Sequence, residues 1–517
     1  MSTLARIVAR HAAVQPHDVA FVDDLGRLTW REYDERSTGL ASALAASGVA
    51  AGDRVAVLLP DGAAVHVCYL AIEKAGGVIV GIGPRAGDRE IEHLLAKSGA
   101  TLLLAEADRA ELADRVGIGH RIVGDEELRH AVAHTAGAAI EGRGMGPNDL
   151  WLLNSTSGTT GLPKCVMHHQ ARWFAFHELA VGAGALRAGD VFMSVVPAPF
   201  GFGIWTAHVT PTVLGAPCVL MPRFDADECL ERIERERVTV LAAVSTQVLM
   251  LVNAATYETR DLSSLRVVFT GGERVPYDAV AELEERTACA VLQFYGSNET
   301  GALSRTTLTD DRERRLRTAG RIIPHMRVRL LDERGSARSA AAARDVTATG
   351  GPGLAVCKGP LTCLGYYEDP EANAALVTAD GWMRTGDVCA LDPDGYLSVV
   401  GRASDFIIRG GKNISAAQVE EEVATHPAVA LAAAVAVPDP VFGERVCVFV
   451  ECRTGGVEAE PALTLEDLQA HLASRGVGKE LWPERLEVVA NLPRSSGGKV
   501  AKGELRALAA RTSETAE

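Results

Sequence analysis

The stretch Asn154-Ser-Thr-Ser-Gly-Thr-Thr-Gly-Leu-Pro-Lys164 decides how the rest of this sequence is interpreted. It combines hydroxyl side chains with two glycines and ends in a lysine. Glycines let backbone N–H groups approach an oxygen anion closely, hydroxyls donate further hydrogen bonds, and the lysine adds positive charge. A Walker-type P-loop is disfavoured because Gly158 and Gly161 are too close together and no hydroxyl follows Lys164. The stretch predicts another kind of phosphate-binding loop, and the alternative is a polar surface turn.

Composition and charge describe a large globular protein. A chain of 517 residues exceeds what one hydrophobic core serves, so we expect at least two domains. With 47% hydrophobic and 23% charged residues, global disorder is excluded. The formal charge of −15 repels phosphate polymers and anionic lipids, so we expect neither nucleic acid nor a membrane as partner. Only eight of the 52 basic residues are lysines, so arginine is the usual cation in this chain and a lysine is expected to have a specific role.

The cysteines and the apolar stretches indicate the compartment. Ten cysteines form no C-x-x-C pair and no metal-ligand spacing, which predicts buried small side chains in a reducing compartment rather than disulfides or structural zinc. The first residues place arginines at helical spacing, unlike a signal peptide. The longest uncharged stretch, about 198–222, is interrupted by Pro199, Pro211 and Pro217 and cannot span a bilayer as a helix. We therefore expect a cytoplasmic protein.

Short apolar runs alternate with amphipathic stretches over the first four hundred residues. The spacing predicts helices such as 64–75 and 225–236 between buried strands. The strands are expected at 54–59, 77–80, 101–104, 191–196, 238–241 and 265–269. Such alternation is typical of parallel sheets covered by helices, which is an α/β fold. Residues 335–344 are small and repetitive, and predict a surface loop.

The pattern changes after Gly401. A strand at 405–408 and a glycine pair precede a helix at 416–425. Three further strands, 429–437, 446–451 and 485–489, flank a second helix at 464–474. We expect a domain boundary near 402–405, followed by a compact α+β domain.

Four further motifs follow the hydroxyl loop in order. They are Thr270-Gly-Gly-Glu273 with Phe294-Tyr-Gly-Ser-Asn-Glu-Thr300, Gly381-Trp-Met-Arg-Thr-Gly-Asp387, Gly401-Arg-Ala-Ser-Asp-Phe-Ile-Ile-Arg-Gly-Gly-Lys-Asn-Ile414, and Leu492-Pro-Arg-Ser-Ser-Gly-Gly-Lys-Val500. With Thr156–Lys164, the set resembles the adenylate-forming superfamily of acyl- and aryl-CoA synthetases, carrier-loading adenylation domains and beetle luciferases. The resemblance covers essentially the whole chain and is closest to stand-alone acyl-CoA synthetases. Three of the eight lysines, at 164, 412 and 499, fall inside these motifs, and Lys502 lies two residues after the last of them.

The resemblance implies a fold and a domain order. The large N-terminal domain, residues 1–402, would consist of helix-covered, mostly parallel sheets with a further small β subdomain. Residues 403–405 would form a hinge around Asp405, and residues 406–517 a small mobile α+β domain. The segment with Gly410 and Gly411 would line the CoA side.

The resemblance also implies a nucleotide site. Tyr295 and the glycines before it would sandwich adenine, Asp387 would take the ribose hydroxyls near Arg402, and Glu299 would bind Mg²⁺, which prefers carboxylate oxygen. The implied catalytic residues are Lys499, Glu299 and Thr156. The other implied nucleotide-binding residues are Ser157, Gly158, Thr159, Thr160, Lys164, Gly271, Gly272, Glu273, Tyr295, Gly296, Ser297, Asn298, Asp387 and Arg402.

The implied reaction has two steps with ATP and CoA as co-substrates. A carboxylate and ATP give an acyl-adenylate and pyrophosphate, and a thiol then displaces AMP. Lys499 would serve only the first step, and rotation of the small domain would remove it for the second. Asn298 stands where threonine is usual and Cys165 where glycine is usual. Ala416 and Gln418 replace the usual proline and glutamate beside the thiol-accepting face.

These departures keep a second hypothesis open. It is an adenylating enzyme that passes its acyl group to a carrier protein or partner enzyme in trans. A luciferase-like oxygenase, a third possibility, would be recognised by light emission or O₂ uptake.

The acid pocket is predicted in the segment Pro197-Ala-Pro-Phe-Gly-Phe-Gly-Ile-Trp205. Amino-acid-activating relatives carry an aspartate where this chain has Gly201, and a buried ammonium without a counter-charge is costly. Phe200, Phe202 and Trp205 would supply apolar wall, so we expect a bulky hydrophobic acid, aromatic or alicyclic. The alternative is a core strand and turn without substrate contact.

Overall fold

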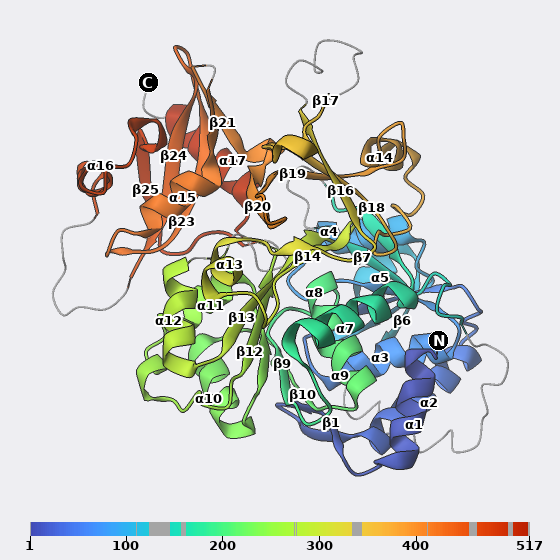
Figure 1. Cartoon of the computed structure of the whole chain (residues 1–517). Coiled ribbons are helices and arrows are strands. Elements are labelled where there is room, and N and C mark those ends of the chain that lie inside the picture. Colours follow the sequence, from blue (N-terminus) through green and yellow to red (C-terminus); the bar gives the residue numbers. More distant parts are fainter. Residues whose placement is uncertain are drawn as a thin grey trace.

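The structure is a computed structural model. It describes residues 2–109, 111–123, 145–156, 162–272, 275, 277–332, 344–410, 412–453, 463–494 and 500–514. The described residues form four sheets. Two lie in the helix-rich lower part of Figure 1, one forms a β subdomain above it, and one belongs to the C-terminal region in orange and red.

The six-stranded sheet carries the base of the hydroxyl loop. Its order is β6 (Gly119–Ile122), β5 (Leu102–Ala105), β3 (Arg54–Leu58), β4 (Val78–Gly81), β7 (Leu152–Ser155) and β8 (Cys165–His168). All neighbours are parallel except β7 and β8, which form an antiparallel pair around residues 156–164. Helices α3 (Ala63–Lys74), α4 (Asp88–Ser98) and α5 (Glu111–Val116) contact this sheet, and α1 (Leu4–Val14) and α2 (Trp30–Ala46) pack against α3.

The nine-stranded sheet carries the second half of the motifs. Its order is β15 (Arg321–Ile322), β14 (Gly301–Arg305), β13 (Ala290–Ser297), β12 (Val267–Gly271), β11 (Val240–Ala242), β9 (Phe192–Ser194), β10 (Cys218–Val219), β1 (Val19–Asp23) and β2 (Gly26–Thr29). The strands from β13 to β1 are parallel. Helices around it include α7 (Gln170–Gly184), α9 (Thr210–Leu214), α10 (Ala226–Glu236), α11 (Ser245–Val252), α12 (Tyr277–Thr287) and α13 (Arg312–Arg317).

Two smaller sheets complete the fold. The β subdomain is antiparallel, with β17 (Arg344–Asp345), β16 (Arg327–Asp332), β18 (Gly353–Lys358), β19 (Met383–Leu391) and β20 (Leu397–Arg402), and helix α14 (Pro370–Leu376) beside it. The C-terminal sheet contains β22 (Lys412–Ser415), β21 (Phe406–Arg409), β24 (Gly443–Cys452), β23 (Val429–Asp439) and β25 (Arg485–Val488), packed by α15 (Ala416–Ala424), α16 (Leu465–Ser474) and α17 (Lys502–Glu514). A short 3₁₀ segment, Ala403–Asp405, connects these two sheets.

The predicted fold class is confirmed. The first part is α/β with parallel-rich sheets, and an α+β region follows. Element ends differ by a few residues, and the strand predicted at 191–196 is shorter because β9 spans Phe192–Ser194. Most of the predicted loop 335–344 lies outside the described residues, whereas Arg344 begins β17.

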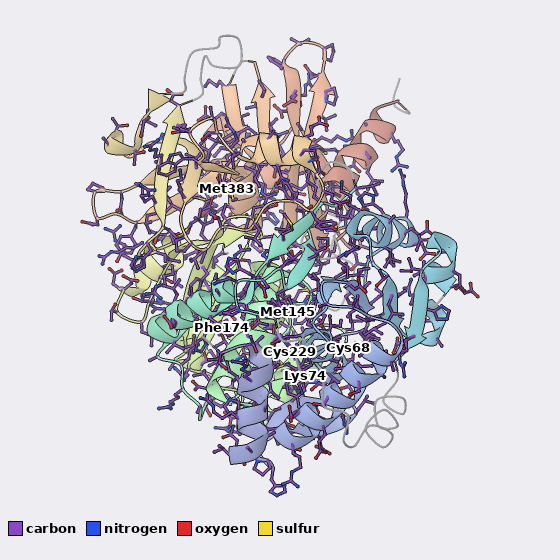
Figure 2. All side chains as sticks on the ribbon, turned by 90° about the vertical axis from the view of Figure 1, so that its right-hand side faces the viewer. Cys68, Lys74, Met145, Phe174, Cys229 and Met383 are labelled. Carbon is purple, nitrogen blue, oxygen red and sulfur yellow. The ribbon has the colours of Figure 1, made fainter. Side chains whose placement is uncertain are left out.

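The cysteines behave as predicted. All ten are free thiols, and nine are buried, among them Cys68 and Cys229 in the interior shown in Figure 2. Lys74, labelled nearby and outside all five motifs, joins α3 to α2 through a 2.7 Å ion pair with Asp34. Within the described ranges, no helix has the length and apolar character needed to cross a bilayer.

Candidate active site

The first half of the site lies where β12 and β13 end side by side. These strands are parallel neighbours, with Gly271 paired to Phe294. A Cβ on Gly271 would lie 2.3 Å from the Phe294 carbonyl oxygen, and Gly272 adopts φ +84°, so the chain turns sharply at positions that suit glycine. Ligands of parallel α/β sheets bind outside the carboxyl ends of the strands. The sheet therefore presents the segment after Phe294 to a binding site.

Tyr295, Asp387 and Arg402 come together at this edge. The Tyr295 hydroxyl donates a 2.8 Å hydrogen bond to Asp387 Oδ2, and Arg402 Nε lies 3.5 Å from Asp387 Oδ1. Asp387 and Arg402 face each other across β19 and β20. Burial, reinforced by nearby Cys389 and Asp387, raises the pKa of Tyr295 well above its ordinary value, so the phenol keeps its proton. The three side chains form one polar wall.

Glu299 lies in a second polar group. Its Oε2 accepts from Ser297 Oγ at 2.8 Å and its Oε1 from the Tyr366 hydroxyl at 2.9 Å. Lys164 Nζ lies 5.4 Å from the Tyr366 ring centroid, which brings the end of the hydroxyl loop to the same place. A carboxylate has about four acceptor positions, so each oxygen of Glu299 keeps one free for a cation.

This donor set fits Mg²⁺. The described residues contain no group of three or more His, Cys, Asp or Glu side chains that could hold a metal. Mg²⁺ is commonly held by one or two carboxylates together with phosphate oxygens and water. A single carboxylate such as that of Glu299, beside the end of the hydroxyl loop, is therefore a suitable arrangement for this cation.

The β7–β8 hairpin closes the hydroxyl loop at its base. Ser155 pairs with Cys165, the Thr156 N–H donates to the Lys164 carbonyl at 3.1 Å, and the Lys164 N–H donates to Thr156 Oγ1 at 3.2 Å. Cys165, which follows the loop lysine, packs into the core. Its burial raises the pKa of the thiol to about 11. The Cys165 side chain therefore contributes core packing to β8.

A buried arginine on α7, Arg172, lies at the site although no sequence motif pointed to it. Arg172 is 2% exposed and donates from Nη2 to the Asn298 carbonyl at 2.6 Å. Its Nη1 donates to His168 Nδ1, and His168 Nε2 lies 2.8 Å from Asn154 Oδ1. Burial lowers the pKa of Arg172 to about 10, which leaves it cationic at neutral pH. No sequence motif pointed to Tyr366, the partner of Glu299, either.

The predicted acid-pocket residues lie on one irregular helical segment. Gly201–Gly203 form a helical turn and Ile204–Val209 a π-helix, a form often found at functional sites. Trp205 is 1% exposed, and its ring lies 4.6 Å from that of Phe176 and 5.1 Å from that of Phe294. Phe202 stacks on Trp205 with 5.4 Å between ring centroids, and Phe200 is buried. A small cavity of about 10 Å³ adjoins Trp205.

Gly201 joins this aromatic cluster to the nucleotide motifs. A Cβ at position 201 would lie 2.6 Å from Asn298 Oδ1 and 3.3 Å from Trp173 Cη2. Asn298 directly precedes Glu299. The structure thus brings the predicted acid pocket, through Gly201, next to the predicted metal ligand.

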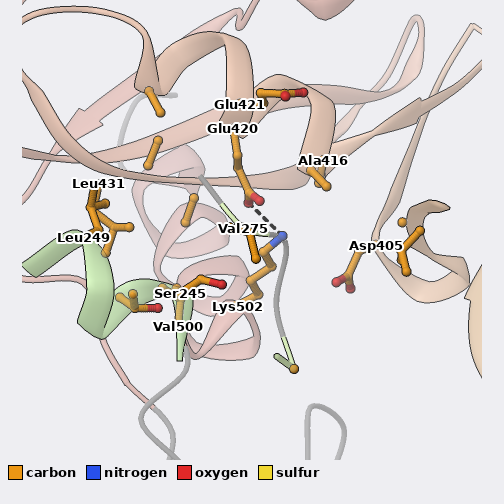
Figure 3. Close-up of a pocket in the computed structure, with 18 of the residues that line it drawn as sticks. Ser245, Leu249, Val275, Asp405, Ala416, Glu420, Glu421, Leu431, Val500 and Lys502 are labelled. Atoms are coloured by element: carbon orange, nitrogen blue, oxygen red, sulfur yellow. Dashed lines mark ion pairs between the residues drawn. The ribbon is translucent and has the colours of Figure 1, made fainter. Parts of the chain in front are cut away.

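A cleft of about 1730 Å³ separates the large domain from the C-terminal region. Tyr295, Asp387 and Arg402 line one side, and Arg494 and Val500 line the other. Figure 3 shows Glu420 and Lys502 pointing toward each other in this cleft, where Lys502 Nζ lies 2.7 Å from Glu420 Oε1. The residues flanking 495–499 therefore face the polar wall.

The hinge candidate Asp405 also lines the cleft. Its Oδ1 accepts from Arg506 Nη2 of α17 at 2.8 Å. Gly410 is exposed, and its N–H donates to the Phe442 carbonyl at 2.8 Å. Several predicted residues lie outside the described residues, namely Ser157, Gly158, Thr159, Thr160, Glu273, Gly411 and Lys499.

Parallel-sheet domains that place these motifs around a cleft, with an α+β domain beyond it, define an adenylate-forming enzyme. Models of the AMP-binding enzyme and of the AMP-binding enzyme C-terminal domain match residues 8–367 and 418–499. The chain belongs to this family of AMP-binding enzymes.

Individual relatives include a CoA synthase and an AMP ligase. The chain is 33% identical to feruloyl-CoA synthase of an Amycolatopsis species, over 96% of this chain and 97% of that one. It is 30% identical to 2,3-dihydroxybenzoate-AMP ligase of Bacillus subtilis, over 92% and 88%. The crystal structure of ATP-bound MatB from Rhodopseudomonas palustris superposes with a TM-score of 0.83 at 26% identity, covering 98% of both chains.

Proposed function

We propose that this enzyme activates a bulky hydrophobic carboxylic acid with ATP, releasing pyrophosphate, and transfers the acyl group from the adenylate to CoA. The observation that carries the proposal is the placement of Gly201, within the aromatic cluster, next to the carboxamide of Asn298 and so beside Glu299. An acid in this cluster would have its carboxylate close to the metal ligand. The similarity to feruloyl-CoA synthase supports a bulky acid as the substrate and CoA as the acyl acceptor.

In the first step, the carboxylate attacks the α-phosphorus of ATP and pyrophosphate leaves. Like charges meet in this step, so preorganised cationic and hydrogen-bonding groups are needed. Bound Mg²⁺ would neutralise phosphate charge, and Glu299 would hold it. Tyr366 and Ser297 fix the two oxygens of Glu299, Thr156 and Lys164 close the hydroxyl loop, and Lys499 would reach the reacting groups.

The nucleoside end is assigned to the opposite wall. We propose that Asp387 accepts from the ribose hydroxyls, because its carboxylate already lies between Tyr295 and Arg402. Gly271, Gly272, Tyr295 and Gly296 would enclose the base. Residues 403–405 would form the hinge between an N-terminal domain, 1–402, and a mobile domain, 406–517, with Gly410 and Gly411 on the CoA side.

Asp387→Ala is expected to weaken ATP binding by about 10- to 100-fold. Hydrogen bonds to a charged group contribute about 1.5–3 kcal/mol, and 1.4 kcal/mol is tenfold in affinity. The measurement is ATP titration by calorimetry. Asp380→Ala is the matched control, because Asp380 lies in the same subdomain, 63% exposed, and pairs with Arg329. Equal affinity in wild type and Asp387→Ala would place the ribose elsewhere.

A pyrophosphate-release screen tests the substrate class. We expect release with a bulky hydrophobic acid, at a rate at least about 100-fold above that with any common amino acid. Position 201 offers an ammonium no carboxylate of its own, and the ammonium would lie near the buried Arg172 guanidinium, at a cost of several kcal/mol. Turnover of an amino acid at a comparable rate would contradict the pocket assignment.

A second function is transfer to a carrier protein or partner enzyme in trans. Ala416 and Gln418, which depart from the usual residues, line the interdomain cleft, and 2,3-dihydroxybenzoate-AMP ligase is among the relatives. With the best acid, ATP and CoA, chromatography separates the two outcomes. Acyl-CoA and AMP support the CoA ligase, whereas acyl-adenylate that accumulates undiminished by CoA supports the alternative.

A further inference from the structure

The carboxamide of Asn298 occupies the space into which a side chain at position 201 would extend. A Cβ on Gly201 would lie 2.6 Å from Asn298 Oδ1, closer than non-bonded atoms approach. Residue 201 must therefore be glycine while Asn298 keeps this position. Residue 298, rather than residue 201, supplies the polar group at this point of the proposed acid pocket.

A chain of hydrogen bonds fixes which end of that carboxamide faces Gly201. It begins at Arg172, whose guanidinium can only donate, so His168 Nδ1 accepts. Burial and the neighbouring Arg172 keep His168 neutral by lowering its pKa well below the ordinary value. The ring proton therefore lies on Nε2 and is donated to Asn154 Oδ1 at 2.8 Å.

The hydrogen-bond partners of Asn154 and Asn298 determine the orientation of both side-chain amides. With its oxygen engaged by His168, Asn154 donates from Nδ2 to Asn298 Oδ1 at 3.3 Å. Asn298 in turn donates from Nδ2 to the Ser155 carbonyl at 3.1 Å, and a carbonyl can only accept. Because the chain starts at an obligate donor and ends at an obligate acceptor, the orientation is determined. The atom that faces Gly201 is an oxygen with a remaining lone pair.

We propose that Asn298 Oδ1 determines acid specificity by accepting a hydrogen bond from a neutral donor, a hydroxyl or an aryl amine, on the carboxylic acid. This inference rests on the proposed function and narrows its substrate class. An ammonium is excluded as the donor, because Arg172 donates to the backbone carbonyl of the same residue at 2.6 Å.

The test compares matched acids that differ in the donor alone. Benzoic acids carrying a hydroxyl or amino group at each ring position are paired with their O-methyl or N,N-dimethyl analogues, and kcat/KM is measured by pyrophosphate release. At one ring position, wild type is expected to favour the donor-bearing acid by about 10-fold or more, because its analogue leaves the acceptor unpaired. In Asn298→Leu, which has the same branched shape and no acceptor, the ratio is expected to fall to about twofold or less.

Two further measurements keep the result decisive. The first is the variant Asn298→Ala, which removes the carboxamide without adding bulk. The second is acid binding followed by quenching of tryptophan fluorescence, to which Trp173 and Trp205 contribute. It compares the dissociation constants of the paired acids without turnover. A wild type without donor preference at any position, or a preference that survives in both variants, overturns the inference while leaving adenylation standing. If no acid in the screen gives pyrophosphate release, the proposed function itself is overturned, and this inference with it.

Discussion

Lys499→Ala is expected to slow pyrophosphate release from acid and ATP by about 10²- to 10³-fold, the usual cost of removing one preorganised group that stabilises transition-state charge. Thioester formation from preformed acyl-adenylate is expected to stay close to the wild-type rate. The reason is that the lysine would contact the carboxylate and α-phosphate only while the first bond forms. Two assays check this, one starting from acid and ATP, the other from synthetic acyl-adenylate and CoA.

The residues that flank 495–499 support a role for Lys499 at the interdomain cleft. Arg494 and Val500, on either side of residues 495–499, line the cleft that Tyr295 and Asp387 line from the large domain. Lys479→Ala is the matched control, since this lysine belongs to the same domain and lies over the Trp482 ring, 5.7 Å from its centroid. If Lys499→Ala slows both half-reactions equally, the assignment of Lys499 to the first step is contradicted.

The fold class could be predicted from the sequence because the alternation of strands and helices and the sequence motifs are both local features. Strand and helix alternation depends on neighbouring residues, and the confirmed α/β and α+β regions follow from that pattern. The motifs also carried their own markers, such as glycines at turns. Gly271 illustrates this, since its missing side chain is required by the approach of the Phe294 carbonyl.

The side chains that orient the motifs could not be predicted in this way. Arg172, His168 and Asn154 lie on three different elements, and their hydrogen bonds depend on how α7 and the β7–β8 hairpin pack against the segment after β13. Tyr366 reaches Glu299 across 67 residues of sequence. Such pairs form only when the sheets and helices have packed against one another, so the local sequence pattern does not show them. The departure of Asn298 from the usual threonine was visible, but its partner at Gly201 was not.

The connection between the domains gives a second large expected effect. The 3₁₀ segment Ala403–Asp405 joins β20 to β21, which belong to different sheets. Arg453 Nη1 donates to Asn253 Oδ1 of the large domain at 2.8 Å, so the C-terminal region also touches the region of α11 in this arrangement (Figure 1). If the small domain must turn to exchange Lys499 for the CoA-side loop, this contact breaks and the dihedral angles of the connection change.

Asp405→Pro is therefore expected to retain acyl-adenylate formation and to lose thioester formation by about 10²-fold or more. The φ of a 3₁₀ residue lies near −50 to −70°, which proline adopts, so the present arrangement is kept while other φ values are denied. Slow domain steps limit turnover in enzymes that close around their substrates. ATP–pyrophosphate exchange and acyl-CoA formation are measured side by side.

Asp405→Ala separates the dihedral effect from the lost ion pair. This variant removes the carboxylate that Arg506 contacts at 2.8 Å but leaves φ free. If rotation about residue 405 is what matters, Asp405→Ala keeps most of its thioester formation and Asp405→Pro does not. Thermal unfolding is followed for both, because proline disfavours the helical conformation of the preceding Ser404. Should exchange and thioester synthesis fall together in Asp405→Pro, with both variants folded, the turning point lies at another residue.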